Sequence, residues 1–443
     1  MNSTKKNENT ASGRKYFNIL FIFSIASFLL MVLILSSCHY EKVDSKVIKP
    51  GYDMRKDLTP TRLTIAMWDY SWLKQHYPGG YFEDYDKVTD ELIERGFNTV
   101  RIEASPLIID RLDSLNQVIT INGEPLATWG ACDTDRKHEL VTELISFMKT
   151  AEEKGLYGIL STWNTDCKEF SDFKDYYSDK DKYKHAWEKV LDLLSKNNLL
   201  DHVVYVDIDQ EFPNFSPFRE NINNLGDKKE PSSVILSAEL KKHNSNDLTS
   251  MDWNESQMTF VHDLIQETLL NYHIKYPALR FTFSFTDHWD EFRAMNLNLL
   301  DVLELHIWME QSERFNARTR FNDMVRDRGD HDYREYMGRL DQTLASIRPM
   351  LLKDMNNRLD YAKSWSEELG APLTTTEAWG PWWHMENEAL QWKWLYDWCE
   401  ECMDMSASYG FWGSTPWNFS HPYWKNWSNI EWYKRVNTNF SAK

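Results

Sequence analysis

Two glutamates follow short apolar runs that are typical of buried strands. Glu211 comes directly after the run Val203–Gln210, and Pro213 stops the strand pattern two residues later. Glu377 ends the run Pro372–Thr376. If both strands belong to one barrel, the two carboxyls stand at strand ends on the same face. Such a pair can supply the proton donor and the nucleophile that double-displacement cleavage of a glycosidic bond needs.

The chain alternates apolar, β-branched runs with segments of helical spacing, and each run ends in a polar or aromatic residue. This alternation predicts an α/β fold, the (β/α)8 TIM barrel, over residues 60–443. A doubly wound open sheet is the alternative, but no glycine-rich phosphate loop follows the first strand. The expected strands are 63–69, 97–103, 156–164, 203–211, 280–289, 302–308, 372–377 and 410–418.

Two insertions interrupt the alternation. Residues 212–252 are polar and contain three prolines, which predicts a long loop after the fourth strand. Residues 311–339 are charged and predict a second insertion after the sixth strand, before a helix at 340–369. Both lie on the face where barrels keep their active sites, so they are expected to shape one end of a cleft.

The N-terminal segment has the pattern of a targeting sequence. A basic start precedes an apolar run from Phe17 to Leu35, and Leu-Ser-Ser-Cys follows, ending at Cys38. This run resembles a bacterial lipobox, which implies a lipoprotein signal peptide over residues 1–38, lipidation of Cys38 and a polar tether over 39–59. An uncleaved signal anchor is the alternative. Either interpretation predicts an extracytoplasmic protein that is attached to a membrane through its N-terminus.

Charge and composition narrow the classes of partner. The net charge is −18, and it becomes −21 without residues 1–38. Such an acidic chain is not expected to bind nucleic acid or anionic polymers, whereas neutral glycans remain open. The 20 Trp, 21 Tyr and 22 Phe exceed what a barrel core of branched aliphatics needs. Many of these rings are therefore expected around a cleft.

No metal or other cofactor is expected from the cysteines. Cys399 and Cys402 lie within a helical pattern and lack a second pair of ligands, so we interpret them as buried thiols. Cys132 and Cys167 fall in the loops assigned after the second and third strands. They either form a disulfide or remain two free thiols, and the sequence leaves both possibilities open.

The strand-end residues together resemble the cellulase-like clan of retaining glycoside hydrolases, and within it the family-5 enzymes. That pattern places an Arg on strand two, Glu on strands four and seven, His on strand six and Trp on strand eight. The matching residues are Arg101, Glu211, Glu377, His306 and Trp417. The resemblance implies that Glu211 is the general acid/base and Glu377 the nucleophile.

Two positions depart from the family pattern. The residue before the acid/base is commonly Asn, which binds the sugar 2-hydroxyl, and here it is Gln210. The extra methylene displaces that contact or requires a reshaped loop. The strand-six His is commonly followed two residues later by Tyr, and here by Trp308, whose indole N–H can still donate one hydrogen bond.

The neighbouring residues have expected roles beside the two glutamates. Arg101 is expected to keep Glu377 ionised, or else to form a salt bridge that seals the barrel. The pKa of Glu211 is expected to be raised by desolvation from Phe212 and by the charge of Glu377. His306 either joins the carboxylate network or is a satisfied core residue.

Aromatic and polar residues near other strand ends are candidates for sugar binding. Trp417 is the expected platform at the cleavage point, although core packing is an equally open interpretation for every ring. The candidate outer platforms are Trp68, Trp163, Trp379, Trp382 and Trp383, and the candidate hydroxyl-binding groups are Asp69, Asn164, Asp287 and Asp290.

These observations predict a retaining hydrolase of β-linked oligo- or polysaccharides. The alternative is a surface lipoprotein that keeps the sugar-binding cleft of such an enzyme but has lost catalysis, which the departures at Gln210 and Trp308 favour.

Overall fold

The computed structural model describes residues 61–123, 132–226, 252–327 and 329–443. The predicted signal peptide, Cys38 and the tether lie outside the described residues. Within these ranges, no helix has the length and apolar character needed to cross a bilayer.

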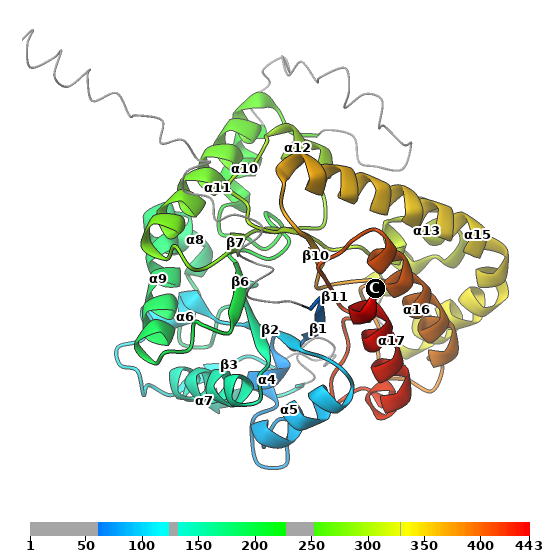
Figure 1. Ribbon diagram of the computed structural model, residues 1–443, viewed down its shortest axis with the longest axis horizontal. Coiled ribbons are helices and arrows are strands. Elements are labelled where there is room, and N and C mark those ends of the chain that lie inside the picture. Colours follow the sequence, from blue (N-terminus) through cyan, green and yellow to red (C-terminus); the bar gives the residue numbers. More distant parts are fainter. Residues whose placement is uncertain (1–60, 124–131, 227–251, 328) are drawn as a thin grey trace, which may run out of the picture. The chain divides into compact units, whose positions relative to one another are not determined.

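Parallel strands form the centre of the described chain (Figure 1). Their order is β7-β6-β5-β2-β1-β11-β10-β9-β8, and every neighbouring pair is parallel. β7 and β8 are two halves of the single segment 281–285, so both ends of the order meet there and the sheet closes into a (β/α)8 barrel. The strands are β1 (Leu63–Met67), β2 (Thr99–Glu103), β5 (Tyr157–Ser161), β6 (Val203–Asp207), β7 (Phe281–Thr282), β8 (Ser284–Phe285), β9 (Leu303–Leu305), β10 (Leu373–Thr375) and β11 (Gly413–Ser414).

Amphipathic helices surround these strands (Figure 1). In α7, for example, the buried residues Leu140, Leu144, Phe147 and Ala151 recur at helical spacing and face the sheet. The longer helices are α5 (Tyr85–Glu94), α7 (Leu140–Glu153), α9 (Lys180–Lys196), α11 (Glu255–Lys275), α15 (Asp330–Leu369), α16 (Trp392–Ser408) and α17 (Ile430–Ala442). The shorter ones are α4 (Ser71–Lys74), α6 (Pro106–Arg111), α8 (Phe173–Tyr177), α10 (Arg219–Gly226), α12 (Trp289–Ala294), α13 (Glu313–Thr319) and α14 (Phe321–Asp327), with 3-10 turns η2 (Met309–Gln311) and η3 (Lys425–Ser428).

The two insertions contain helices where they are described. α10 follows β6, and residues 227–251 lie outside the described residues. After β9 come η2, α13 and α14, and α15 begins at Asp330 instead of near Leu340. The buried rings of Tyr333 and Tyr336 are spaced for one helix face, but the surrounding charges hid this pattern. The structure also adds a short antiparallel pair, β3 (Ile119–Ile121) and β4 (Arg136–His138), between β2 and α7.

Most of the described tryptophans stabilise the core. A large apolar cluster fills the space between the strands and the surrounding helices, and a small one lies at Leu63, Ile65, Ile159, Val204, Tyr205 and Val302. Eight tryptophan side chains are fully buried: Trp68, Trp72, Trp187, Trp365, Trp379, Trp383, Trp417 and Trp424. The expectation that the surplus rings surround a cleft is therefore correct for only a minority of them. The thiols of Cys132 and Cys167 are both free.

Candidate active site

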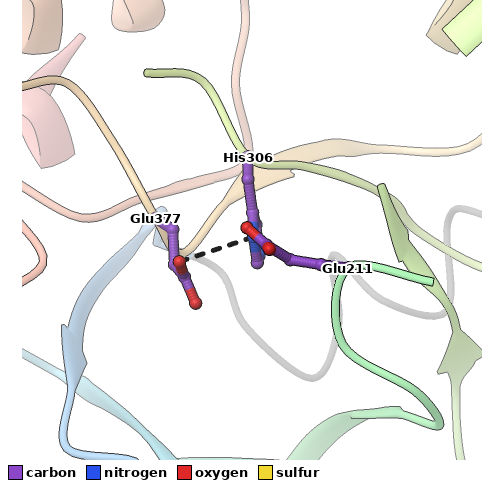
Figure 2. Close-up of side chains that lie close together, drawn as sticks. All are labelled: Glu211, His306 and Glu377. Carbon is purple, nitrogen blue, oxygen red and sulfur yellow. Dashed lines mark hydrogen bonds and ion pairs between the residues drawn. The ribbon is translucent and has the colours of Figure 1, made fainter. Parts of the chain in front are cut away.

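Glu211 and Glu377 meet over one end of the barrel (Figure 2). Glu377 follows β10, and Glu211 follows β6 with a positive φ of 48°, which turns its side chain out of the strand direction. One carboxylate oxygen of each glutamate and one ring nitrogen of His306 all lie within 4.8 Å of one another. This spacing matches that of a retaining pair, whose carboxyl groups stand roughly 5–5.5 Å apart, and is shorter than the roughly 6.5–9.5 Å of an inverting pair.

His306 connects the two glutamates. Its Nδ1 lies 2.9 Å from Oε1 of Glu211 and 3.5 Å from Oε2 of Glu377. Its Nε2 lies 3.3 Å from an Nη atom of Arg101, which can only donate, so Nε2 accepts and the proton resides on Nδ1. Burial lowers the pKa of His306, in keeping with a neutral ring. The neutral imidazole therefore donates to Glu211.

Arg101 holds Glu377 from the opposite side. The guanidinium is fully buried and donates to Glu377 Oε1, to Thr376 Oγ1 at 2.5 Å, and to both oxygens of Asp69 at 2.8 and 2.6 Å. Asp69 also accepts from the indole of Trp163 at 2.6 Å. This bidentate pairing fixes the plane of the guanidinium and thereby the position of the Glu377 carboxylate.

A deeper carboxylate orients this network. Glu304 on β9 is fully buried and accepts from the Thr376 backbone N–H at 2.6 Å, the Thr376 hydroxyl at 2.7 Å and the Tyr205 hydroxyl at 2.9 Å. The Thr376 hydroxyl thus donates to Glu304 and accepts from Arg101. These contacts fix the residue that immediately precedes Glu377.

The environment of Glu211 favours its protonated form. Burial raises the pKa of Glu211 to about 8, with a further contribution from the negative charge of Asp287. Hydrogen bonds from the side chains of Trp308 and Thr286, together with the charge of Arg101, oppose this rise. Burial raises this pKa as expected, whereas the negative charge that adds to it comes from Asp287 and not, as expected, from Glu377.

Glu377 has a different balance of interactions. Burial raises its pKa above the ordinary value, and the adjacent His306 and Arg101 lower it. Of the two glutamates, only Glu377 contacts the Arg101 guanidinium directly. The positive charge of this guanidinium favours the ionised form of Glu377. The two carboxyls therefore have unequal surroundings, with the cation in contact with Glu377 only.

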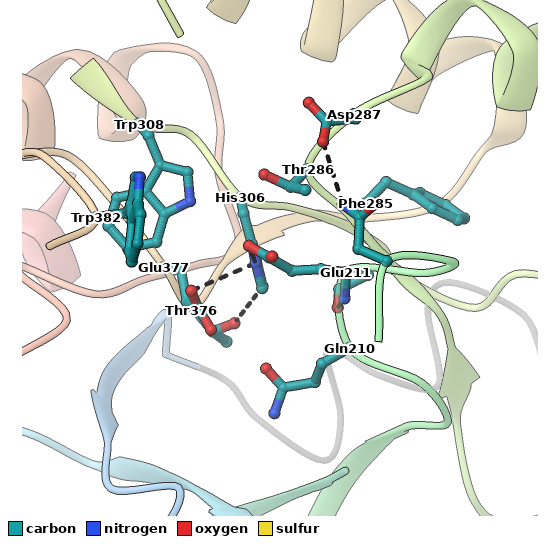
Figure 3. A network of polar contacts seen from close by, with 12 residues as sticks. Gln210, Glu211, Phe285, Thr286, Asp287, His306, Trp308, Thr376, Glu377 and Trp382 are labelled. Atoms are coloured by element: carbon teal, nitrogen blue, oxygen red, sulfur yellow. Dashed lines mark hydrogen bonds and ion pairs between the residues drawn. The ribbon is translucent and has the colours of Figure 1, made fainter. Parts of the chain in front are cut away.

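Both carboxyls open into a cleft of about 740 Å³. Its size suits a short stretch of sugar rings. Figure 3 shows Trp308 and Trp382 at this cleft together with Asp287. The lining residues are Tyr70, Trp163, Glu211, Asn214, Phe215, Arg219, Thr286, Asp287, Trp308, Glu310, Gln311, Asn316, Asn322, Glu377, Trp382 and Trp383.

Of the predicted sugar-binding residues, Trp163, Trp308, Trp382, Trp383 and Asp287 line this cleft. Asp69 and His306 lie beneath the carboxylates and hold the network. The amide of Gln210 is buried and donates to Ser161 Oγ at 2.7 Å, so it points away from Glu211 (Figure 3). Asn164 is also withdrawn, because its amide donates to Asp209 at 2.8 Å.

Three rings that were expected to be platforms are core residues. Trp68 packs against Phe82 and donates its indole N–H to the Ser420 carbonyl. Trp379 donates to the Thr415 carbonyl. Trp417 is surrounded by other rings and is 2% exposed. None of the three lines the cleft. Packing beneath the helices that cover the barrel removes these apolar rings from water, which is favourable.

Sequence reasoning missed Glu310, Thr376 and Glu304. Glu310 lines the cleft from η2, between the expected strand 302–308 and the expected insertion 311–339, so neither prediction included it. Thr376 and Glu304 lie on runs that were recognised as strands. The acidic residue within the apolar run Val302–Leu305 was an available signal, because a charge inside a strand needs buried partners.

Glu211, His306 and Glu377 have donor atoms that a divalent metal accepts. The guanidinium of Arg101 lies against both Glu377 and His306, however, and its charge opposes a second cation at this position. The donor set therefore fits a proton-transfer dyad better than a metal centre.

The geometry agrees with a comparison of the sequence with known families. Residues 65–441 match the cellulase-like family, described as sugar-binding cellulase-like. The chain belongs to this family. No curated protein matches it.

Solved structures share the barrel of this cellulase-like protein. A protein from Parabacteroides distasonis with the provisional description of a glycoside hydrolase aligns with a TM-score of 0.72 at 23% identity, covering 86% of this chain and 94% of that one. An endo-β-1,4-mannanase from Thermotoga petrophila aligns with a TM-score of 0.47 at 10% identity, covering 86% of this chain and 77% of that one.

Proposed function

We propose that this cellulase-like protein is a retaining glycoside hydrolase that cleaves β-linked oligo- or polysaccharides. The observation that carries the proposal is the approach of the Glu211 and Glu377 oxygens to within 4.8 Å over a cleft. The unequal surroundings of the pair support the division of roles, since the cation contacts Glu377, and the pKa is raised to about 8 at the more exposed Glu211 against about 7 at Glu377.

The reaction proceeds by two displacements. The carboxylate of Glu377 forms a bond to the anomeric carbon while the glycosidic C–O bond breaks and Glu211 gives its proton to the departing oxygen. Water then attacks the same carbon, Glu211 takes up a proton from it, and the bond between the sugar and Glu377 breaks. His306 donates to one oxygen of Glu211 and so holds this carboxyl next to Glu377.

The nucleophile is tested with activated aryl β-glycosides. Glu377→Ala is expected to lower kcat by at least about 10³-fold, because the covalent step is lost. Added azide should restore turnover and produce the α-glycosyl azide, since a small anion enters the space that the carboxylate vacates. Glu313→Ala removes an exposed carboxylate outside the cleft and serves as the control. Unchanged turnover in Glu377→Ala refutes the assignment.

The acid/base is tested separately. Glu211→Ala should slow substrates with poor leaving groups far more than activated ones, because activated leaving groups need little protonation. Azide should then give the β-glycosyl azide. Equal loss on both classes of substrate contradicts the role of Glu211.

A second function remains supported by one observation. The Gln210 amide is turned into the barrel wall, so the sugar contact that the family pattern implies at this position is missing. A catalytically inactive sugar-binding protein has no need of that contact. Tight binding of one glycan without turnover of any would favour this function over hydrolysis.

We further propose that Cys38 carries a lipid that attaches the protein to the extracytoplasmic side of a membrane. The basic start, the apolar run and the terminal Leu-Ser-Ser-Cys support this proposal. Cys38→Ser should abolish labelling by a palmitate analogue and block cleavage of residues 1–38, with Cys132→Ser as control. Unchanged labelling refutes lipidation at Cys38, and membrane attachment of an unlabelled, uncleaved wild type identifies a signal anchor.

A further inference from the structure

A third carboxyl, Glu310, faces the cleft without a role in the proposed reaction. It lies on η2, directly after the segment that carries His306 and Trp308. The residue is 9% exposed. Its Oε1 accepts from the Trp382 backbone N–H at 3.3 Å, whereas its Oε2 is buried and has no hydrogen-bond partner within the described residues.

A buried carboxyl oxygen without a hydrogen-bond partner costs free energy, which a ligand that supplies the partner can recover. Burial raises the pKa of Glu310 to about 8, and the nearby charge of Glu211 adds to this effect while Arg358 opposes it. A protonated carboxyl offers one O–H donor and one carbonyl acceptor. Sugar hydroxyls both donate and accept, so they match this pair of functions.

Aromatic rings border the same part of the cleft. The Trp382 backbone touches the Glu310 carboxyl, and the side chains of Trp382 and Trp383 both line the cleft. The Trp382 ring is partly exposed. An indole face beside a hydrogen-bonding carboxyl is the combination that binds the C–H face and the hydroxyls of one sugar ring.

The charged side chains that line the cleft disfavour sugars that carry a negative charge. Four carboxyl groups line it, those of Glu211, Asp287, Glu310 and Glu377, against the single guanidinium of Arg219. A sugar with a carboxylate or sulfate group brings another negative charge into this poorly solvated space. An uncharged ring meets no such penalty.

We propose that Glu310 and Trp382 form a sugar-binding subsite on the wall of the cleft, where the Glu310 carboxyl hydrogen-bonds to hydroxyl groups of an uncharged sugar ring. The inference rests on the proposed function, because it takes the cleft as the substrate site. It adds a specificity-determining residue to the two catalytic glutamates.

The test measures binding, not turnover. Cellotetraose, mannotetraose and xylotetraose are titrated by calorimetry into the Glu377→Gln protein, so that hydrolysis does not consume the probe. With the tetraose that binds, adding Glu310→Ala should weaken the affinity about tenfold, which corresponds to the loss of one buried hydrogen-bonded pair. Adding Glu310→Gln should change the affinity less than threefold near pH 6, because the amide also offers a donor and an acceptor.

Controls separate a local effect from a structural one. Glu313→Ala removes an exposed carboxylate three residues away and should leave the affinity unchanged. If Glu310→Ala does not fold, Trp382→Leu decides, since it keeps the backbone contact and removes the ring. Where cellotetraose or mannotetraose binds, its counterpart with carboxylates at C6 should bind at least tenfold more weakly.

The outcomes distinguish the subsite from the reaction. Unchanged affinity in Glu310→Ala, or in Trp382→Leu where it is needed, overturns the subsite even if the enzyme hydrolyses aryl glycosides. If the carboxylated tetraose binds with the same affinity as the neutral one, the preference for uncharged rings is overturned. The same conclusion follows if none of the three neutral tetraoses binds. Binding with the expected losses, but without turnover in the Glu377-containing protein, supports the subsite and refutes hydrolysis.

Discussion

The Nδ1 atom of His306 lies 2.9 Å from Oε1 of Glu211, and the donor on its other side fixes the direction of this bond. Arg101 occupies Nε2 and can only donate, so the imidazole is neutral and its single proton points to Glu211. The histidine thereby holds the Glu211 carboxyl by a hydrogen bond without adding a charge. The positive charge beside the glutamate pair belongs to the Arg101 guanidinium, which contacts Glu377.

The basic limb of kcat/KM should follow the pKa of Glu211, which is raised to about 8. The first displacement needs a protonated Glu211, so activity falls as the pH rises through this value. Trp308→Phe removes a donor that stabilises the ionised form, which raises the pKa and should move the limb up by roughly one pH unit. Asp287→Asn removes a negative charge and should move the limb down. Shifts in the same direction for both variants would contradict this account.

Arg101→Met should destabilise the protein by about 3–5 kcal/mol, because it leaves the buried carboxylates of Asp69 and Glu377 without their cation. Urea unfolding measures the change. Arg101→Met combined with Asp69→Asn should recover part of the loss, since one uncompensated charge is removed. Arg320→Met breaks an exposed pair and should cost no more than about 1 kcal/mol. If Arg101→Met lowered the free energy of unfolding as little as Arg320→Met does, the network of Asp69, Arg101 and Glu377 would not be tightly buried.

Exhaustive dialysis against a chelator should leave turnover unchanged, because Arg101 stands where its charge opposes a cation among Glu211, His306 and Glu377. The measurement compares the dialysed enzyme with the same enzyme after return of zinc, manganese or calcium. Activity that is lost on dialysis and restored by one of these ions would identify a metal centre instead.

Stability should fall on acidification partly because of His421. Burial lowers the pKa of His421 to about 3, and neither ring nitrogen has a partner within the described residues. Below an unfolded pKa of about 6.5, the unfolded chain binds a proton that the folded chain does not, so the free energy of unfolding falls by about 1.4 kcal/mol per pH unit. His421→Phe should remove this contribution between pH 6 and pH 4, as measured by urea unfolding. His331→Phe, at an exposed position, should leave the pH dependence of the free energy of unfolding unchanged.

The strand ends could be predicted from the sequence, and with them the approach of the two glutamates. β-branched runs and helical spacing determine a (β/α)8 barrel, and parallel strands bring their carboxyl ends to one face. Arg101, Glu211, His306 and Glu377 all sit on such runs or directly after them. For these residues, position along the chain already implies position in space.

The role of each ring and of Glu310 was decided only by the tertiary structure. Trp68, Trp379 and Trp417 lie near strand ends as Trp163 does, yet they are buried and Trp163 lines the cleft. Periodicity describes a strand or a helix, but it does not extend to the connecting segments, whose side chains are placed by whatever packs over them. The burial that raises the pKa of Glu310 and leaves one of its oxygens without a partner comes from residues distant in the chain, so no local pattern contains it.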